Sequence, residues 1–363
     1  MRLFAPVVLA VVLLLPDAAG AAYCSPLDCA PSQFTLAHGT MLAVRLGVHK
    51  PVRVLDLRTG ATRWWLPPGI VTGGTLVHQD GRLLTWYDLA TGARVRDAVL
   101  QPKGAFALVG SSQDARRAVL ARTQRLSTTF AIVSPTAQRT VRVGGRNWQF
   151  DALNGSFLYL VQAVQDLSGY RIRLFDLARN RLDTRPLKSA GESATIAGAP
   201  AARTSAAGGR DLLTLYITAD GRAMVHELDT AAGTAHCIDL PGAGDAGKAL
   251  TWALVPDVDP GTVWAVSVGY GRVVALDLAA HAVRLRFAFH PGKWLANPGV
   301  GVLAPDGDHV AVTDAEHIWI VTPALARVAR GPSHVAIALG YAPDQRRLWV
   351  VGERSRVSAL PVR

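Results

Sequence analysis

Short runs of alternating apolar and polar residues, each ending at an acidic turn, recur along this chain. In residues 52–56 (VRVLD) one arginine stands among apolar residues, which is the alternation of a strand with one buried face. Asp56 then opens a turn, and Gly60, four residues later, offers a position that tolerates a positive φ. No segment has the 3.6-residue periodicity of a long amphipathic helix. The pattern therefore predicts an all-β protein of short antiparallel strands.

This unit of strand and turn repeats at a roughly constant interval. The copies lie at residues 52–65, 83–95, 129–141, 170–182, 223–234, 271–283, 317–328 and 356–363. Their turns are about 44 residues apart on average, which suits the blade of a β-propeller, a sheet of four short antiparallel strands. Eight copies favour eight blades, but the first two turns, only 32 residues apart, leave little room for four strands. We therefore predict a β-propeller of seven four-stranded blades, with eight as the alternative, and expect Phe34–His38 to complete the last blade.

The whole organisation resembles the bacterial β-propellers of the YVTN and WD-repeat type, although the Trp-Asp dipeptide itself is absent. The resemblance covers nearly all of residues 33–363, so it implies one β-propeller domain and not two independent domains. It implies an architecture rather than an activity, because this fold hosts binding proteins, scaffolds and enzymes alike.

Residues 1–22 have the features of a secretory signal peptide. Arg2 gives a positive start, residues 3–15 form an apolar run, and small residues at 18–22 offer cleavage sites. The run is too short to cross a bilayer, which takes roughly 20 apolar residues. We therefore expect a secreted, extracytoplasmic protein whose mature chain begins near Ala22 or Tyr23 and has no transmembrane segment.

Residues 23–32 form a leader that carries two of the three cysteines, Cys24 and Cys29. In an oxidising compartment these two could close a small disulfide loop, which would leave Cys237 as a buried free thiol. Lipid attachment at Cys24 is a further option, although Tyr23 stands where lipoprotein signals carry a small residue. The Cys-x-x-Cys and paired-histidine spacings of a zinc site are absent.

The chain is strongly basic, with a net charge of +11 from 38 Lys and Arg against 27 Asp and Glu. Its basic residues are scattered singly or in pairs, such as Arg116-Arg117, and no run of five occurs. The sequence also lacks an RNP-like aromatic segment and a helix-turn-helix pattern. We therefore interpret the charge as a solvated surface and expect no nucleic-acid partner.

One copy of the repeat carries a more specific signal. Asp56, the Thr-Gly turn after it and Trp64 resemble the blade motif of quinoprotein dehydrogenases, in which a tryptophan eight residues after the aspartate locks neighbouring blades. In the second copy Asp88 and its Thr-Gly turn match, but Arg96 occupies the tryptophan position. The motif is structural even in that family, and the adjacent cysteine pair of some of those enzymes is absent. We therefore expect no cofactor.

The loops that link one blade to the next are the candidate binding surface, because they ring the mouth of the central channel. Basic and aromatic residues gather in the loops at 144–148 and 290–294, a combination that suits an acidic or sugar-like ligand. The alternative is that these tryptophans pack between blades while the cations are merely solvated. The candidate ligand-binding residues are Arg146, Trp148, His290, Lys293, Trp294 and His334.

No catalytic constellation stands out along the sequence. We therefore predict an exported, noncatalytic and monomeric β-propeller that serves as a binding scaffold for a protein, a peptide or a carbohydrate. The alternative is a lactonase-like hydrolase with one divalent metal in its central channel, because such a site is assembled from distant positions that a sequence scan does not connect.

Overall fold

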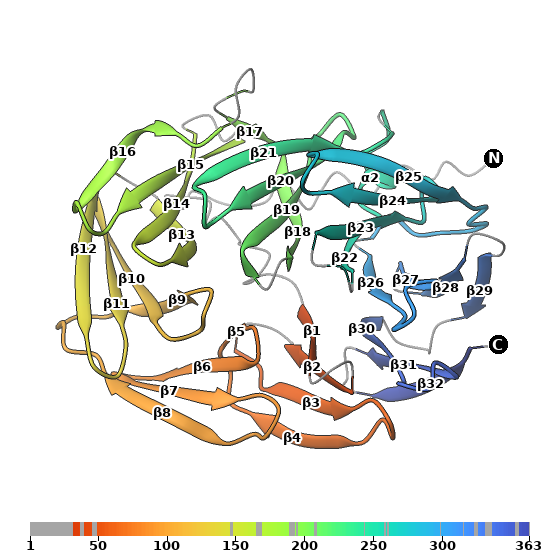
Figure 1. Cartoon of the computed structure of the whole chain (residues 1–363), viewed down its shortest axis with the longest axis horizontal. Coiled ribbons are helices and arrows are strands. Elements are labelled where there is room, and N and C mark those ends of the chain that lie inside the picture. Colours follow the sequence, from red (N-terminus) through yellow and green to blue (C-terminus); the bar gives the residue numbers. More distant parts are fainter. Residues whose placement is uncertain are drawn as a thin grey trace, which may run out of the picture.

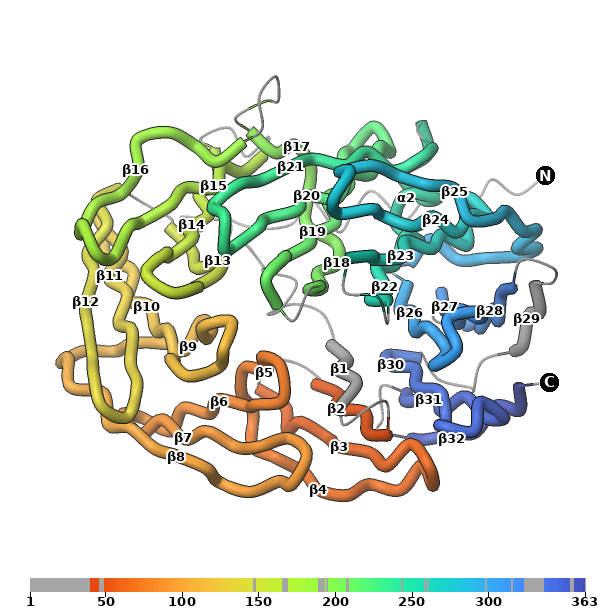
Figure 2. The backbone as a smooth tube through the Cα atoms, viewed as in Figure 1, coloured from red at the N-terminus to blue at the C-terminus, as the bar shows by residue number. Residues whose placement is uncertain are grey.

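The computed structural model describes residues 32–36, 40–45, 49–145, 148–164, 169–188, 193, 195–206, 209–242, 244–257, 259, 261–297, 299–314, 316–322, 326–330, 336–352 and 356–362. For residues 32–36 and 326–330 it describes the backbone alone. These residues form eight antiparallel sheets, arranged as the blades of a propeller around a ring (Figures 1 and 2).

The first four blades fill the N-terminal half of the ring. Blade 1 contains β1 (Ser32–Leu36), β2 (Met41–Arg45), β3 (Val52–Asp56) and β4 (Thr62–Leu66). Blade 2 contains β5 (Ile70–Thr72), β6 (Thr75–Asp80), β7 (Leu83–Asp88) and β8 (Arg94–Val99). Blade 3 contains β9 (Ala107–Ser111), β10 (Ala118–Gln124), β11 (Ser127–Val133) and β12 (Gln138–Gly144). Blade 4 contains β13 (Trp148–Asn154), β14 (Phe157–Ala163), β15 (Gly169–Asp176) and β16 (Arg181–Pro186), and the short β17 (Ile196–Ala197) also pairs with β15.

The other four blades complete the ring. Blade 5 contains β18 (Ala199–Ala206), β19 (Asp211–Ile217), β20 (Ala223–Asp229) and β21 (Thr234–Asp239). The short helix α2 (Ala246–Ala249) leads to blade 6, which contains β22 (Trp252–Pro256), β23 (Thr262–Ser267), β24 (Arg272–Asp277) and β25 (Ala282–Ala288). Blade 7 contains β26 (Val300–Leu303), β27 (Val310–Thr313), β28 (His317–Val321) and β29 (Ala326–Arg330). Blade 8 contains β30 (Ala336–Tyr341), β31 (Arg347–Gly352) and β32 (Val357–Pro361).

The β-propeller of four-stranded antiparallel blades is confirmed, but the prediction of seven blades is wrong, because the ring has eight. The short interval between the first two turns holds a complete blade. Blade 2 fits because β5 has only three residues and the links and turns around it are short: residues 67–69, 73–74 and 81–82. The sequence spacing therefore reflected compact loops and not a missing strand.

The expected position of the first strand is also corrected. β1 pairs antiparallel with β2, with Ser32 opposite Arg45 and Leu36 opposite Met41, so it belongs to blade 1 and not to the last blade. Blade 8 consequently has three strands, and β32 is the outermost of them among the described residues. The third strand of a blade is usually well covered, as in β20, but β32 is only partly buried.

The ring closes through side chains of blade 8 that pack on blade 1. The indole Nε1 of Trp349 in β31 donates a hydrogen bond to the Leu57 carbonyl oxygen at 2.6 Å. The Trp349 ring also covers Gly60, where an added Cβ would lie 2.3 Å from the indole. Around this contact lies one shared apolar cluster of both blades, made of Leu42, Val44, Leu55, Leu57, Ile337, Ala338, Ala342, Trp349 and Val351.

Related contacts join other neighbouring blades. Trp64 of blade 1 donates its indole N–H to the Leu89 carbonyl of blade 2 at 3.1 Å, and its ring lies against Gly92. Between blades 4 and 5, the Tyr159 hydroxyl donates to the Thr230 carbonyl at 2.8 Å. In each case a bulky side chain fills the seam and its polar atom satisfies a backbone carbonyl in a turn. Trp64 thus contacts the neighbouring blade, as the resemblance to the blade motif predicted.

Chain direction divides the loops between two faces of the ring. Because the strands of a blade are antiparallel, the turns after its first and third strands open on one side, and the turn after its second strand and the link to the next blade open on the other. We call the first side the turn face and the second the link face. The Asp-x-x-x-Gly turns therefore lie on the turn face, opposite to the interblade loops that the sequence favoured for binding.

The described residues contain no helix that is long and apolar enough to cross a membrane.

Gly60 and Gly307 form a matched pair that tests the closure contact. Both have positive φ values, +72° and +78°, but Gly60 lies under Trp349 whereas Gly307 has open space around it. We expect Gly307→Ala to lower the free energy of unfolding by about 1 kcal/mol through backbone strain. Gly60→Ala should lower it by about 1–3 kcal/mol more, because the indole must also move. Denaturant titration measures both losses, and equal losses would contradict the closure role of Trp349.

Candidate functional site

The structure places Trp148 inside the protein. Trp148 is 3% exposed and belongs to the apolar cluster between blades 3 and 4. Its indole N–H donates to the Gly144 carbonyl at 2.8 Å, and the Arg173 guanidinium lies 5.4 Å from the centre of its ring. This environment matches the alternative in which the tryptophan packs between blades. The predicted residues Arg146 and His334 lie outside the described residues.

The other three predicted binding residues lie together on the loop between blades 6 and 7. His290 and Lys293 are exposed, and Trp294 is half-buried against the cluster of those two blades. Blade 7 holds this loop: Trp319 Nε1 donates to the Pro291 carbonyl at 2.9 Å, and the buried Asp314 carboxylate accepts from the Leu295 N–H at 2.6 Å. Their role in binding stays a prediction. The proposed disulfide partners Cys24 and Cys29 lie outside the described residues, whereas Cys237 is partly buried and forms no disulfide with another described residue.

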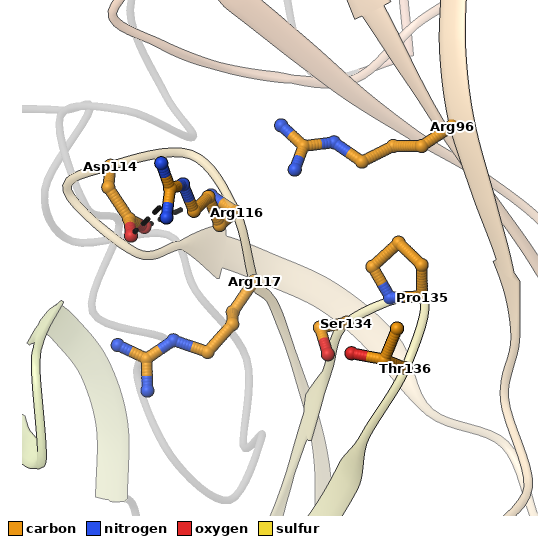
Figure 3. Close-up of a pocket in the computed structure, with 7 residues that line it drawn as sticks. All are labelled: Arg96, Asp114, Arg116, Arg117, Ser134, Pro135 and Thr136. Atoms are coloured by element: carbon orange, nitrogen blue, oxygen red, sulfur yellow. Dashed lines mark hydrogen bonds and ion pairs between the residues drawn. The ribbon is translucent and has the colours of Figure 1, made fainter.

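A cleft lined by several charged side chains lies on the turn face, in the seam between blades 2 and 3 (Figure 3). It is a cleft of about 430 Å³ between β8 and two turns of blade 3, at residues 112–117 and 134–137. We call it the basic cleft. Its lining residues are Arg96, Asp114, Arg116, Arg117, Ser134, Pro135 and Thr136.

Both turns that line the basic cleft are held by their own side chains. Ser112 Oγ donates to Asp114 Oδ1 at 2.5 Å and accepts from the Arg117 N–H at 3.0 Å. Ser134 Oγ similarly accepts from the Ala137 N–H at 3.0 Å. These local bonds are typical of serine and aspartate in turns, and they present the neighbouring side chains from a fixed backbone.

Asp114 is the one carboxylate that lines the basic cleft, and it is already engaged. Its Oδ1 accepts from the Arg116 N–H at 3.0 Å, and its Oδ2 lies 3.9 Å from Arg116 Nε. Burial acts to raise the pKa of Asp114, but the hydrogen bonds from Ser112 and Arg116 and the charges of Arg117 and Arg116 lower the pKa below its ordinary value. The carboxylate is therefore ionised at neutral pH and offsets one of three guanidinium charges.

Arg96 stands where the blade motif would place a tryptophan. Its guanidinium lies 5.7 Å from the centre of the Trp86 ring, and Nη2 is 3.5 Å from the Ala115 carbonyl of blade 3. Its Nε is buried and has no hydrogen-bond partner among the residues that the structure describes. Figure 3 shows the Arg96 side chain extending across the opening toward the turn that carries Asp114 and Arg116. A cation thus occupies the position that an indole fills in the preceding seam.

A second cluster of ionisable groups lies between blades 5 and 6. Glu227 is 3% exposed, and its Oε2 is 2.9 Å from Nδ1 of His281, whose ring stacks on that of His236 with centroids 3.4 Å apart. Burial raises the pKa of Glu227 above its ordinary value, although the bond to His281 opposes the shift. Nearby, a hydrogen bond from Arg210 lowers the pKa of Asp229.

No group of three or more His, Cys, Asp and Glu side chains suited to a metal ion occurs among the residues that the structure describes. The chemistry that the basic cleft does support is recognition of negative charge: guanidinium groups form paired hydrogen bonds with oxyanions.

Sequence reasoning noted each of the three arginines but did not connect them. Arg96 was only a departure from the blade motif, and Arg116-Arg117 was only a scattered basic pair. The sequence did hold one signal that could have found the cleft. A cation stands at the tryptophan position of blade 2, and two more stand in the first turn of blade 3.

No model of a known protein family matches the sequence, and no curated protein matches it. Among solved structures, the Dos1 propeller is similar over 93% of each chain, with 8% identity and a TM-score of 0.52. A Kuenenia stuttgartiensis hydrazine synthase chain (12% identity, 80% of this chain and 93% of that one, TM-score 0.42) also matches. The Myceliophteria thermophila Cps50 (Swd1) β-propeller domain matches as well, with 12% identity over 96% of this chain and 100% of that one and a TM-score of 0.47. At these identities the likeness to the Dos1 propeller supports the fold alone.

Substitutions at Glu227 and Asp229 should shift the pH dependence of stability in opposite directions. A raised folded pKa means that Glu227 contributes stability below its unfolded pKa that is lost as the pH rises through the folded value. Glu227→Gln should therefore gain stability relative to the parent between pH 4 and pH 7. The lowered pKa of Asp229 contributes stability that is present above the unfolded pKa and is lost as the pH falls through the folded value, so the stability deficit of Asp229→Asn should be largest at pH 7 and shrink below about pH 4. Thermal unfolding from about pH 3 to pH 7 tests this, and deficits that change with pH in the same direction for both variants would contradict it.

Proposed function

We propose that this protein is an exported, noncatalytic β-propeller scaffold, and that it binds an acidic protein, peptide or carbohydrate at the basic cleft. The observation that carries the proposal is the charge of this cleft: three arginines and one aspartate line it, and that aspartate is already bonded within its own turn. The cleft therefore has two positive charges in excess, which an acidic partner would balance.

The physical setting favours binding over chemistry. The lining side chains include arginines, which stay protonated at any physiological pH and are poor proton-transfer groups. Their backbone belongs to strand β8 and two turns of a rigid ring, so little backbone entropy is lost when a partner docks. A propeller is also a common scaffold for interactions, and the likeness to the Dos1 propeller is consistent with that architecture.

The seam position of the basic cleft also makes it accessible to a large partner. The cleft is open on the turn face, and exposed Pro135 and Thr136 stand at its rim on blade 3. A partner that reaches both blades would contact Arg96 of one and the two arginines of the other. Such a partner would use opposite charge to orient its approach before short-range contacts form.

Binding of a labelled peptide of ten glutamates tests the proposal. We expect the combined variant Arg96→Gln, Arg116→Gln and Arg117→Gln to bind this peptide at least tenfold more weakly than the parent, because the excess charge is gone. Fluorescence anisotropy at 50 and 300 mM salt measures the affinity, which should fall with salt for the parent.

Arg125→Gln is the matched control for peptide binding. Arg125 is exposed and belongs to the same blade, but it lies in the turn after β10 and so on the link face. Its affinity should stay within about twofold of the parent, because charges beyond about 8–10 Å are screened at moderate salt. Equal losses in Arg125→Gln and the triple variant would show a diffuse charge effect and overturn the basic cleft as the binding site.

Export has its own test. We expect the full-length chain, produced with its first 22 residues, to appear outside the cytoplasm with a mature N-terminus at Ala22 or Tyr23. Intact mass spectrometry of the released protein measures this. A cytoplasmic product that retains Met1 or Arg2 would contradict the export part of the proposal and leave the binding part to be judged separately.

A further inference from the structure

The basic cleft has a charge deficit that a single negative charge does not fill. Arg96, Arg116 and Arg117 face one carboxylate, Asp114, so two positive charges are uncompensated. Arg116 is the guanidinium nearest to that carboxylate, at 3.9 Å, while Arg117 makes no hydrogen bond through its guanidinium among the described residues. A ligand with one carboxylate would leave one positive charge unbalanced, whereas a dianion would balance both.

Hydrogen-bond donors are also left over in the cleft. Arg96 Nε is buried without a partner, and its Nη2 reaches only a long contact of 3.5 Å to Ala115. The Thr136 hydroxyl makes no hydrogen bond to the described residues either. Buried donors without acceptors are uncommon in folded proteins, because each costs the desolvation of a polar group. An acceptor in the cleft would offer the Arg96 guanidinium a shorter hydrogen bond than its 3.5 Å contact to Ala115.

The donors come from both walls of the seam, which constrains the shape of the acceptor. Figure 3 shows Arg96 extending over the opening from blade 2 and Ser134 and Thr136 standing on the blade 3 side, while the Arg116 side chain folds back onto Asp114. A planar carboxylate presents two oxygens in one plane, whereas a tetrahedral oxyanion presents oxygens in several directions. Donors on separate walls of the cleft therefore suit the tetrahedral group better.

We propose that the basic cleft binds a doubly charged phosphate group, either free or as a monoester on a larger molecule. This rests on the proposed function, since it names the group that the acidic partner would offer at the same site. A phosphate monoester carries a charge of about −1.5 to −2 at neutral pH, with a second pKa near 6. Its charge and its acceptor oxygens thus match the two excess cations and the unused donors.

The departure from the blade motif at Arg96 gives a direct test. Arg96→Trp restores the residue type that fills the seam between blades 1 and 2, where Trp64 is accommodated. We expect this variant to fold with an unfolding temperature close to that of the parent, because a bulky ring can fill the seam. It should lose at least tenfold in affinity for phenyl phosphate, because the ring occupies the cleft and removes one cation.

The binding probes are phenyl phosphate, inorganic phosphate and benzoate at equal ionic strength, measured by titration calorimetry and by ³¹P line broadening. Phenyl phosphate should bind the parent at least tenfold more tightly than benzoate, which has the same ring and one charge. Its affinity should fall severalfold from pH 7.5 to pH 5, as the dianion becomes a monoanion. Inorganic phosphate binding as tightly as the ester would identify free phosphate as the source, and tighter ester binding would identify a larger phosphorylated molecule.

Two further variants keep the test decisive if Arg96→Trp fails to fold. Arg116 is exposed, so Arg116→Gln should leave folding unchanged and lower phenyl phosphate affinity at least threefold, whereas Arg125→Gln on the link face should not change it. Equal binding of phenyl phosphate and benzoate, or unchanged binding in Arg116→Gln, would overturn the phosphate proposal. If the glutamate peptide still bound in that case, the acidic-partner function would stand. If neither ligand bound, both proposals would fail.

Discussion

The ring depends on how the edge of one blade packs against the turn of the next. A blade is a single sheet, so both of its faces are buried only against its neighbours, and the last blade must meet the first. Here the closure is made by Trp349, whose ring takes the space above Gly60 and whose N–H reaches the Leu57 carbonyl. The glycine is needed twice, because the turn requires a positive φ and the indole requires the absence of a Cβ. The buried indole N–H would be costly without an acceptor, so its hydrogen bond to Leu57 fixes the orientation of the Trp349 ring, which apolar contact alone would not do.

The same requirement distinguishes the seam between blades 2 and 3 from the seam between blades 1 and 2. In the seam between blades 1 and 2 the Trp64 ring packs against Gly92 and its N–H finds a carbonyl partner at 3.1 Å, beside a smaller cleft of about 280 Å³. Arg96 has a flat terminal group, charge and several donors, and its nearest carbonyl is at a marginal distance. Stacking near Trp86 holds the guanidinium in the seam without satisfying it. An opening with unused donors is the physical result, and the two arginines of the neighbouring turn add charge to it.

The strands and turns of this fold follow from local sequence, but the seams do not. Alternation around positions such as 52–56 reports the buried face of a strand directly, and the Asp-x-x-x-Gly spacing reports the turn after it. The number of blades depended on how short β5 and the loops around it are, and loop length leaves no periodic pattern in the sequence. Trp148 looked like a binding residue because its loop is basic, yet its exposure is set by two blades that are distant in sequence. The basic cleft was hidden for the same reason, since residues 96 and 116 belong to different sheets.

The two faces of the ring carry separable groups of charges. The basic cleft lies on the turn face, while His290 and Lys293 lie in a link that Asp314 and Trp319 hold on the opposite face. A strand of five to seven residues separates the faces by roughly 16–23 Å at about 3.3 Å per residue. This exceeds the screening length of about 8 Å at physiological salt, so the link-face charges contribute little to the potential in the cleft. Recognition at the cleft is therefore a local property of one seam, and the rest of the basic charge acts mainly as solvated surface.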